Sequence, residues 1–145
     1  KLRNDYYMSY EILKLDIGDY TALGDYYDYT FIDRKSGNDL QGTVGKHNID
    51  RFKREIERAT EVGAYLFVVI ESSVEKIIKE NKIFNRKANI DYTLRQIKDI
   101  SHTYPRSCQF IFAENREGAA RLIPRILMAG KKIWNTDMQY FLDKE

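Results

Sequence analysis

An uninterrupted apolar segment at 64–70 constrains the possible folds of this chain most strongly. It reads Ala-Tyr-Leu-Phe-Val-Val-Ile and is followed by Glu71. A strand that has no polar face has to be covered on both sides, as the central strand of a parallel sheet is. The segment therefore predicts the inner strand of a sheet that has helices packed on both faces.

The residues before this strand form the clearest helical pattern in the sequence, at 49–61. Four apolar residues recur there at steps of three and four, which places them on one face of a helix. They are Ile49, Phe52, Ile56 and Ala59. Weaker patterns predict strands at 11–17, 29–35 and 108–113, and helices at 73–80, 93–103 and 115–130. Strands that alternate with helices predict an α/β fold with a parallel or mixed central sheet.

Several local features are expected in the first half of the chain. The strands at 11–17 and 29–35 are close enough in sequence to pair antiparallel. Asn38 is expected to cap a short helical turn that ends at Leu40, and the glycines at 42 and 45 predict a flexible connection.

In the second half, residues 81–92 show no clear period and are expected to form a loop. Asn115 is expected to cap the last helix, and Pro124 to kink it. Cys108 is interpreted as a core thiol. The tail from Lys131 is rich in aromatic residues and is expected to dock either on the domain or on a second copy of the chain.

Composition sets wide limits on function. The chain has 145 residues, enough for one domain, and 24 Lys and Arg against 22 Asp and Glu. A net charge of +2 says little about nucleic acid, so that case depends on local clustering. One cysteine excludes an intramolecular disulfide and a cysteine-built zinc site. No membrane span or signal peptide is visible, so we expect a cytoplasmic protein, or a nuclear one in a eukaryote.

Carboxylates and a lysine gather between positions 18 and 39. Asp33 and Lys35 are two residues apart, so a strand at 29–35 places both side chains on one face. The antiparallel pairing would bring Asp19 near that face. Two carboxylates that converge with an amine are unfavourable unless a cation binds there or the charges are neutralised.

This arrangement suits cleavage of a phosphodiester with magnesium. Mg²⁺ takes oxygen ligands and keeps several waters, so Asp19 and Asp33 are sufficient carboxylates, and the backbone carbonyl of Arg34 is a further candidate ligand. Lys35 could hold the attacking water or the scissile phosphate. The Arg34 side chain would face away from the pair. Each piece taken alone also has an ordinary explanation, since Asp-x-Lys is common on strands and Gly-Asp-Tyr is common at turns.

In their order along the chain these residues resemble a known nuclease motif. Gly18-Asp19-Tyr20, Asp33-Arg34-Lys35-Ser36 and Asp39-Leu40 are similar to Gly-Asp … Glu-Arg-Lys-x-x-x-Asp, the motif of the XPF-type structure-specific endonucleases. The similarity extends over roughly residues 11–130. That family belongs to the PD-(D/E)XK nuclease superfamily. The resemblance therefore implies a restriction-endonuclease-like central mixed β-sheet flanked by helices on both faces.

The resemblance also implies roles for the motif residues. It implies cleavage of DNA at branched or single-strand/double-strand junctions with Mg²⁺ or Mn²⁺. Asp19 and Asp33 correspond to metal ligands, Lys35 to the catalytic lysine, and the supporting motif positions are Gly18, Arg34 and Asp39. The motif's Glu is replaced by Asp33, which is one methylene shorter.

Two departures from the family pattern bear on the completeness of the site. The family has a further acidic residue on an upstream strand, often in an Asp-x-Arg-Glu segment, and nothing in residues 1–10 matches it. The tandem helix–hairpin–helix domain of many relatives is also missing. We therefore expect a single nuclease domain over 1–145, either shortened at its N-terminus or lacking one acid, and most similar to stand-alone phage or bacterial members.

DNA contacts are expected on the helix at 49–61 and in two other places. The candidate phosphate-binding residues on the helix are Arg51, Arg54 and Arg58. The alternative is a solvated face with Arg51–Glu55 and Lys53–Glu57 pairs. A second basic loop would contain Lys82, Arg86 and Lys87, and an unpaired base could stack on Tyr26, Tyr27 or Tyr29.

Three functional hypotheses remain at this stage. The first is a metal-dependent DNA endonuclease, with a homodimer suggested by family habit and by the aromatic tail. The second is a catalytically weak or inactive nuclease-like domain that binds branched DNA as a partner or scaffold subunit. The third is an enzyme that acts on RNA or a nucleotide, because metal chemistry on a phosphodiester looks alike in both.

Overall fold

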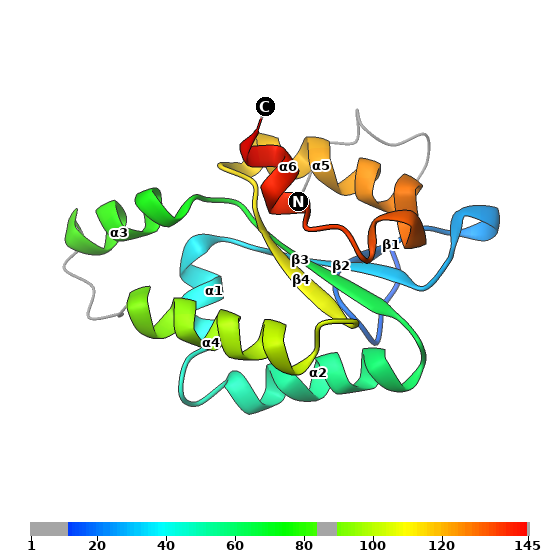
Figure 1. Cartoon of the computed structure of the whole chain (residues 1–145), viewed down its shortest axis with the longest axis horizontal. Helices are drawn as coiled ribbons and strands as arrows, with labels where there is room; N and C mark the ends of the chain where they lie inside the picture. The colour runs from blue at the N-terminus through cyan, green and yellow to red at the C-terminus, as the bar shows by residue number, and fades with distance from the viewer. Residues whose placement is uncertain (1–11, 84–89, 145) are drawn as a thin grey trace.

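The computed structural model describes residues 12–83 and 90–144, and four strands within these ranges form one sheet (Figure 1). They are β1 (Tyr20–Thr21), β2 (Thr30–Lys35), β3 (Tyr65–Ile70) and β4 (Cys108–Phe112), in that order across the sheet. β2, β3 and β4 run parallel, and β1 is antiparallel to β2. The predicted mixed central sheet is confirmed.

Helices cover both faces of this sheet. They are α1 (Gly37–Thr43), α2 (Ile49–Glu61), α3 (Val74–Ile83), α4 (Ile90–Thr103), α5 (Arg116–Ala129) and α6 (Met138–Asp143), with 3-10 turns η2 (Gly24–Tyr26) and η3 (Gly130–Ile133). Figure 1 shows α2 and α4 on one side of the sheet and α5 and α6 on the other. The α/β class is confirmed, and the arrangement is consistent with a restriction-endonuclease-like domain. No helix in the described ranges is long and apolar enough to cross a membrane.

Strand β3 is the centre of the hydrophobic core, as its apolar sequence predicts. All six of its residues are buried. Leu66, Val68 and Ile70 pack into the cluster that contains Phe52 and Ile56 of α2 and Ile100 of α4. The alternate residues Tyr65, Phe67 and Val69 pack with Ala119, Ile123 and Ile126 of α5. The neighbouring Cys108 is a core thiol as expected, and burial raises its pKa to about 12.

The strand predicted at 11–17 is wrong for the residues that the structure describes. Residues 12–19 form no strand, and β1 starts only at Tyr20. Ile12 and Leu13 are exposed, whereas Ile17 enters the core. The reason is the left-handed turn at Gly18, because the chain can align with β2 only after this turn. Residues 1–11 lie outside the described ranges.

Two helix boundaries also differ from the sequence interpretation. Ser36, not Asn38, caps α1, because its hydroxyl accepts a hydrogen bond from the Asp39 N–H at 3.0 Å. α1 then continues through Gly42, which is therefore helical and not part of a flexible connection. The loop predicted at 81–92 is helical at both ends, since α3 extends to Ile83 and α4 begins at Ile90; residues 84–89 lie outside the described ranges.

Helix α5 begins as predicted. The Asn115 side-chain oxygen accepts a hydrogen bond from the Gly118 N–H at 2.7 Å. The helix continues through Pro124 to Ala129, and the kink at that proline stays a prediction.

The C-terminal tail docks on the domain through Trp134. Its ring stacks on Tyr65 with the centroids 5.3 Å apart, and its indole N–H donates a hydrogen bond to the Thr30 hydroxyl at 2.8 Å. Gln139 on α6 adds a contact, since its side-chain oxygen accepts the Phe112 N–H at 2.6 Å. Phe141 remains exposed. The tail is therefore tied to β2, β3 and β4.

We predict that Trp134→Ala lowers the free energy of unfolding by about 3 kcal/mol, because a large ring and a buried hydrogen bond are lost together. Chemical denaturation followed by circular dichroism measures this change. Phe141→Ala is the matched control on the same tail and should change stability by less than about 0.5 kcal/mol. Equal losses in the two variants would contradict docking through Trp134.

Candidate active site

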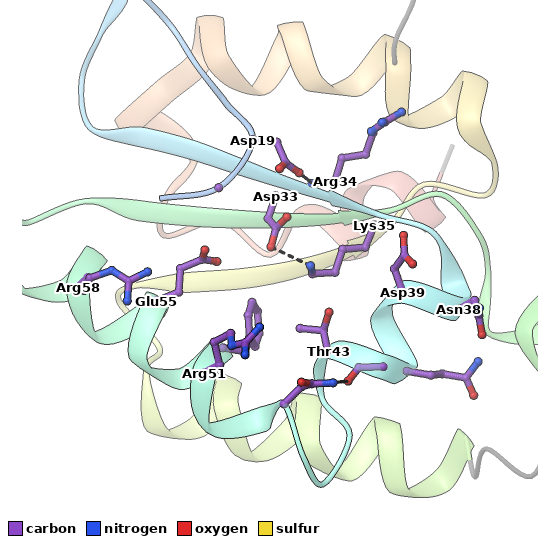
Figure 2. Close-up of a pocket in the computed structure, with 15 residues that line it drawn as sticks. Asp19, Asp33, Arg34, Lys35, Asn38, Asp39, Thr43, Arg51, Glu55 and Arg58 are labelled. Carbon is purple, nitrogen blue, oxygen red and sulfur yellow. Dashed lines mark hydrogen bonds and ion pairs between the residues drawn. The ribbon is translucent and has the colours of Figure 1, made fainter. Parts of the chain in front are cut away.

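A polar cleft of about 930 Å³ lies between the second half of β2 and helices α1 and α2 (Figure 2). Several of the predicted site residues line it, from three segments of the chain. They are Gly18, Asp19, Asp33, Arg34, Lys35, Asp39, Arg51 and Arg58. The fold therefore brings together residues that the sequence separates by up to forty positions.

Asp33 and Lys35 form the centre of the cleft. The Lys35 Nζ lies 3.2 Å from Oδ2 of Asp33, so the two side chains share a face of β2 as the spacing predicted. Asp33 is only 7% exposed. The Lys35 ammonium also lies 5.9 Å from the centre of the Phe52 ring on α2. Helix α2 thus covers one side of this ion pair.

Asp19 is held at the edge of β2 by backbone contacts. Its N–H donates to the Ile32 carbonyl at 2.7 Å, and its Oδ2 accepts the Arg34 N–H at 2.9 Å. Gly18 makes this possible, because its φ is +62° and a Cβ there would lie 2.6 Å from the Ile32 carbonyl oxygen. The Gly-Asp pair therefore fixes a carboxylate beside Asp33 through the main chain.

The environment of Asp33 makes its carboxyl group easy to protonate. Burial raises its pKa to about 7, although the Lys35 ammonium acts in the opposite direction. A hydrogen bond with the Asp19 carboxyl group and the charges of Asp19 and Glu55 also contribute to this raised value. The cleft thus gathers more negative charge than Lys35 neutralises.

Arg34 points to the opposite face of the sheet, as expected. Its Nη1 lies 3.5 Å from Oε2 of Glu71, the residue that follows β3. This ion pair gives Glu71 a structural role. Only the backbone of Arg34 shares the edge of β2 at which the Asp19 carboxylate lies.

Glu55 on α2 is the site residue that the sequence interpretation missed. It lines the cleft, and burial raises its pKa although the Lys35 ammonium and the backbone of Gly18 act in the opposite direction. The sequence contains a signal for this position. Glu55 is three residues after Phe52 and four before Ala59, both on the buried stripe, so the helix turns it inward.

The polar face of α2 is only partly the solvated face that we considered. Neither the Arg51–Glu55 nor the Lys53–Glu57 ion pair forms within the described residues, and Glu57 instead accepts the Tyr104 hydroxyl at 2.8 Å. Arg51 and Arg58 line the cleft, whereas Arg54 does not.

Other predicted residues lie away from the cleft or outside the described ranges. The tyrosines expected beside the site are at the opposite end of β2, before Thr30. This is a correction, and its cause is that β2 runs from them toward Asp33. Lys82 ends α3, and Arg86, Lys87 and the segment 1–10 lie outside the described ranges.

The donor groups of the cleft bear on metal binding. Among residues 12–83 and 90–144, no three His, Cys, Asp or Glu side chains are arranged to hold a metal ion. Mg²⁺ retains several waters and takes only one or two carboxylates. Asp19 and Asp33, with adjacent carboxyl groups, are hard oxygen donors that fit this lower requirement.

Comparison with known families gives a match over most of the chain. The family model for the ERCC4 domain matches residues 1–126, which include the whole cleft. No curated protein matches the chain at a significant level.

We predict that Gly18→Ala destabilises the protein by more than about 2 kcal/mol, because left-handed backbone strain and the carbonyl contact act together. Thermal and chemical denaturation measure the loss. Gly63→Ala is the matched control: Gly63 also has a positive φ, of +69°, but its added Cβ meets nothing within 4 Å. It should cost only about 1 kcal/mol. Similar costs for both variants would argue against the close approach at Gly18.

A pH-dependent stability follows from Asp33. Its carboxyl group titrates at about 7 in the folded state and at about 3.9 in an unfolded chain, so folding binds a proton between these values. The free energy of unfolding should therefore fall as pH rises from about 4 to about 7. Urea titrations in EDTA should show a smaller fall for Asp33→Asn and an unchanged fall for the exposed Asp50→Asn. Identical profiles for Asp33→Asn and wild type would disprove the assignment.

Proposed function

Because the chain belongs to the ERCC4 domain family, which implies a nuclease-like domain that acts on branched DNA, we propose that it is a metal-dependent endonuclease. Its substrate is DNA at a branch or a single-strand/double-strand junction. The observation that supports this most strongly is the Asp33–Lys35 pair, with the Asp19 carboxyl group against Asp33. A buried carboxylate in an open polar cleft is costly to maintain and is typical of functional sites.

Asp19 and Asp33 would hold Mg²⁺ or Mn²⁺. A bound ion would stabilise charge on the phosphate and acidify a bound water. The Arg34 carbonyl remains a candidate ligand, because backbone groups two residues apart on a strand face the same edge. The Ile32 carbonyl oxygen accepts the Asp19 N–H at this edge, and the Arg34 carbonyl two residues later faces the same edge.

Lys35 and Glu55 would have different roles in the proposed reaction. An ammonium group is only a donor, so Lys35 suits a phosphate oxygen and stabilises the charge that develops there. The attacking water needs a proton acceptor instead. Glu55 lines the cleft beside Asp33 and Lys35, and burial raises its pKa, so it suits that role.

The arginines of α2 extend the cleft along the expected DNA backbone. Arg51 and Arg58 contribute positive charge to its wall, and Figure 2 shows both at the α2 side of the site. Phosphate contacts of this kind position DNA without reading its sequence. This supports a substrate chosen by structure. Asp39, on the first turn of α1, shares the cleft and stays a supporting residue.

We predict that the protein cuts labelled flap and splayed-arm DNA only when Mg²⁺ or Mn²⁺ is added. Asp33→Asn, Lys35→Ala and Glu55→Gln should each lower the cleavage rate by at least about 100-fold, as expected for a positioned acid–base or charge-stabilising group. Cleavage is measured by gel electrophoresis under single-turnover conditions, beside duplex DNA and a junction made of RNA.

The control variant is Glu61→Gln, an exposed carboxylate on the same helix as Glu55, which should cut at the wild-type rate. Cleavage that persists in EDTA or in both Asp33→Asn and Lys35→Ala would refute the site. Tight junction binding without any cleavage would favour a scaffold role, and faster cleavage of the RNA junction would favour the third hypothesis.

A further inference from the structure

A group of exposed tyrosines lies at the end of β2 opposite the cleft. Tyr26, Tyr27 and Tyr29 belong to the connection between β1 and β2, and all three are exposed. Figure 1 shows this connection, with η2, projecting beyond the sheet away from α1. The Tyr27 and Tyr29 rings lie with their centroids 4.9 Å apart. We call Tyr27, Tyr29 and Lys131 the aromatic patch.

A lysine completes this patch from the other end of the sequence. The Lys131 Nζ lies 5.8 Å from the Tyr29 ring centre and 5.6 Å from that of Trp134. Among the described residues no carboxylate lies within ion-pair distance of it. The next residue, Lys132, is exposed as well. Flat ring faces therefore lie beside unneutralised positive charge.

A network of hydrogen bonds joins the two segments of the patch. The Asp28 carboxylate accepts the Lys131 N–H at 2.8 Å and the Thr30 hydroxyl at 2.6 Å. The Thr30 oxygen in turn accepts the Trp134 indole N–H at 2.8 Å. A Cβ at Gly130 would collide with Asp28, so the contact between the two segments requires a glycine there. The backbones that carry the rings and the lysine are thus joined before any partner binds.

The patch spans the amino end of β2, with Tyr27 on the face that carries the cleft and Lys131 beside Trp134 on the opposite face. The Tyr27 ring packs edge-on against Phe31, with centroids 6.0 Å apart, and Phe31 lies on the same face of β2 as Asp33. Tyr29 precedes Asp33 by four residues, which is about 13 Å along a strand. That length matches about four stacked nucleotides.

From this geometry we propose that the aromatic patch binds the single-stranded arm of the DNA that enters the cleft, by stacking unpaired bases on Tyr27 and Tyr29 and pairing a phosphate with Lys131. The inference deepens the proposed function and rests on it. Ring faces beside cations are the common way to bind single strands without sequence preference. A two-fold interface of two copies would contain this basic patch twice and so gather Lys131 and Lys132 of both chains, which disfavours that occupant.

The experiment measures binding of the full chain to fluorescent oligothymidine in EDTA, by anisotropy. Tyr27→Leu keeps apolar bulk without a stacking ring, and Tyr29→Asn suits the left-handed backbone of that position, where φ is 69°. Each should weaken binding about fivefold or more. Tyr27→Phe should bind normally. Lys131→Gln keeps the backbone hydrogen bond to Asp28 and should reduce the slope of log affinity against log salt by about 0.7.

Tyr140→Leu is the matched control, because Tyr140 is also exposed and has the Lys144 ammonium 5.0 Å from its ring, but lies on α6. It should leave binding unchanged. A junction DNA with 2-aminopurine in its single-stranded arm should show quenching about four nucleotides from the junction, lost in Tyr27→Leu. Melting curves establish that each variant is folded.

Three results would overturn the proposal: no oligothymidine binding by the wild type, equal losses in Tyr140→Leu and the patch variants, or unchanged affinity with a shift from dimer to monomer. The last result would identify a second copy as the occupant. Failure of cleavage with intact, tyrosine-dependent binding would instead count against the proposed function alone. Unaltered cleavage with tyrosine-independent binding would count against the aromatic patch alone.

Discussion

The buried charge of Asp33 is the constraint on which the rest of the site depends. A carboxylate at this depth is tolerated only beside a fixed cation or a shared proton, and the chain provides both through Lys35 and Asp19. The strand places Lys35 by its two-residue alternation, whereas Asp19 needs a separate segment at the edge of β2. In the proposed function a divalent cation would relieve this cost by replacing the proton.

Gly18 connects this electrostatic arrangement to the fold. Its left-handed turn ends the irregular segment before β1 and sets Asp19 against β2. One residue without a side chain therefore allows the Asp19 carboxylate to lie against β2. This explains in physical terms why a Gly-Asp pair, and not an acid alone, precedes the Asp-Arg-Lys strand.

The sequence predicted what depends on local periodicity and missed what depends on packing between distant segments. The apolar run of β3, the stripe of α2 and the shared face of Asp33 and Lys35 all follow from residue spacing. The place of β1 did not, because a short alternation before Gly18 looks like a strand whether or not a partner is available. The charge of Glu55 favours a solvated face in the sequence, and only the cleft formed with β2 shows where it lies.

The direction of β2 determines which functional groups lie at each of its ends. In a parallel sheet the carboxyl ends of the strands carry the chemistry, because loops and helix starts converge there, and Asp33 and Lys35 follow this rule. The amino end of the same strand is free to serve another purpose, and the network of Asp28, Thr30 and Trp134 fixes its tyrosines to the C-terminal tail. A strand arm that ran from Tyr27 along the cleft face of β2 would meet a ring first and carboxylates about 13 Å later. One strand would then set both where an unpaired segment is held and where it is cut.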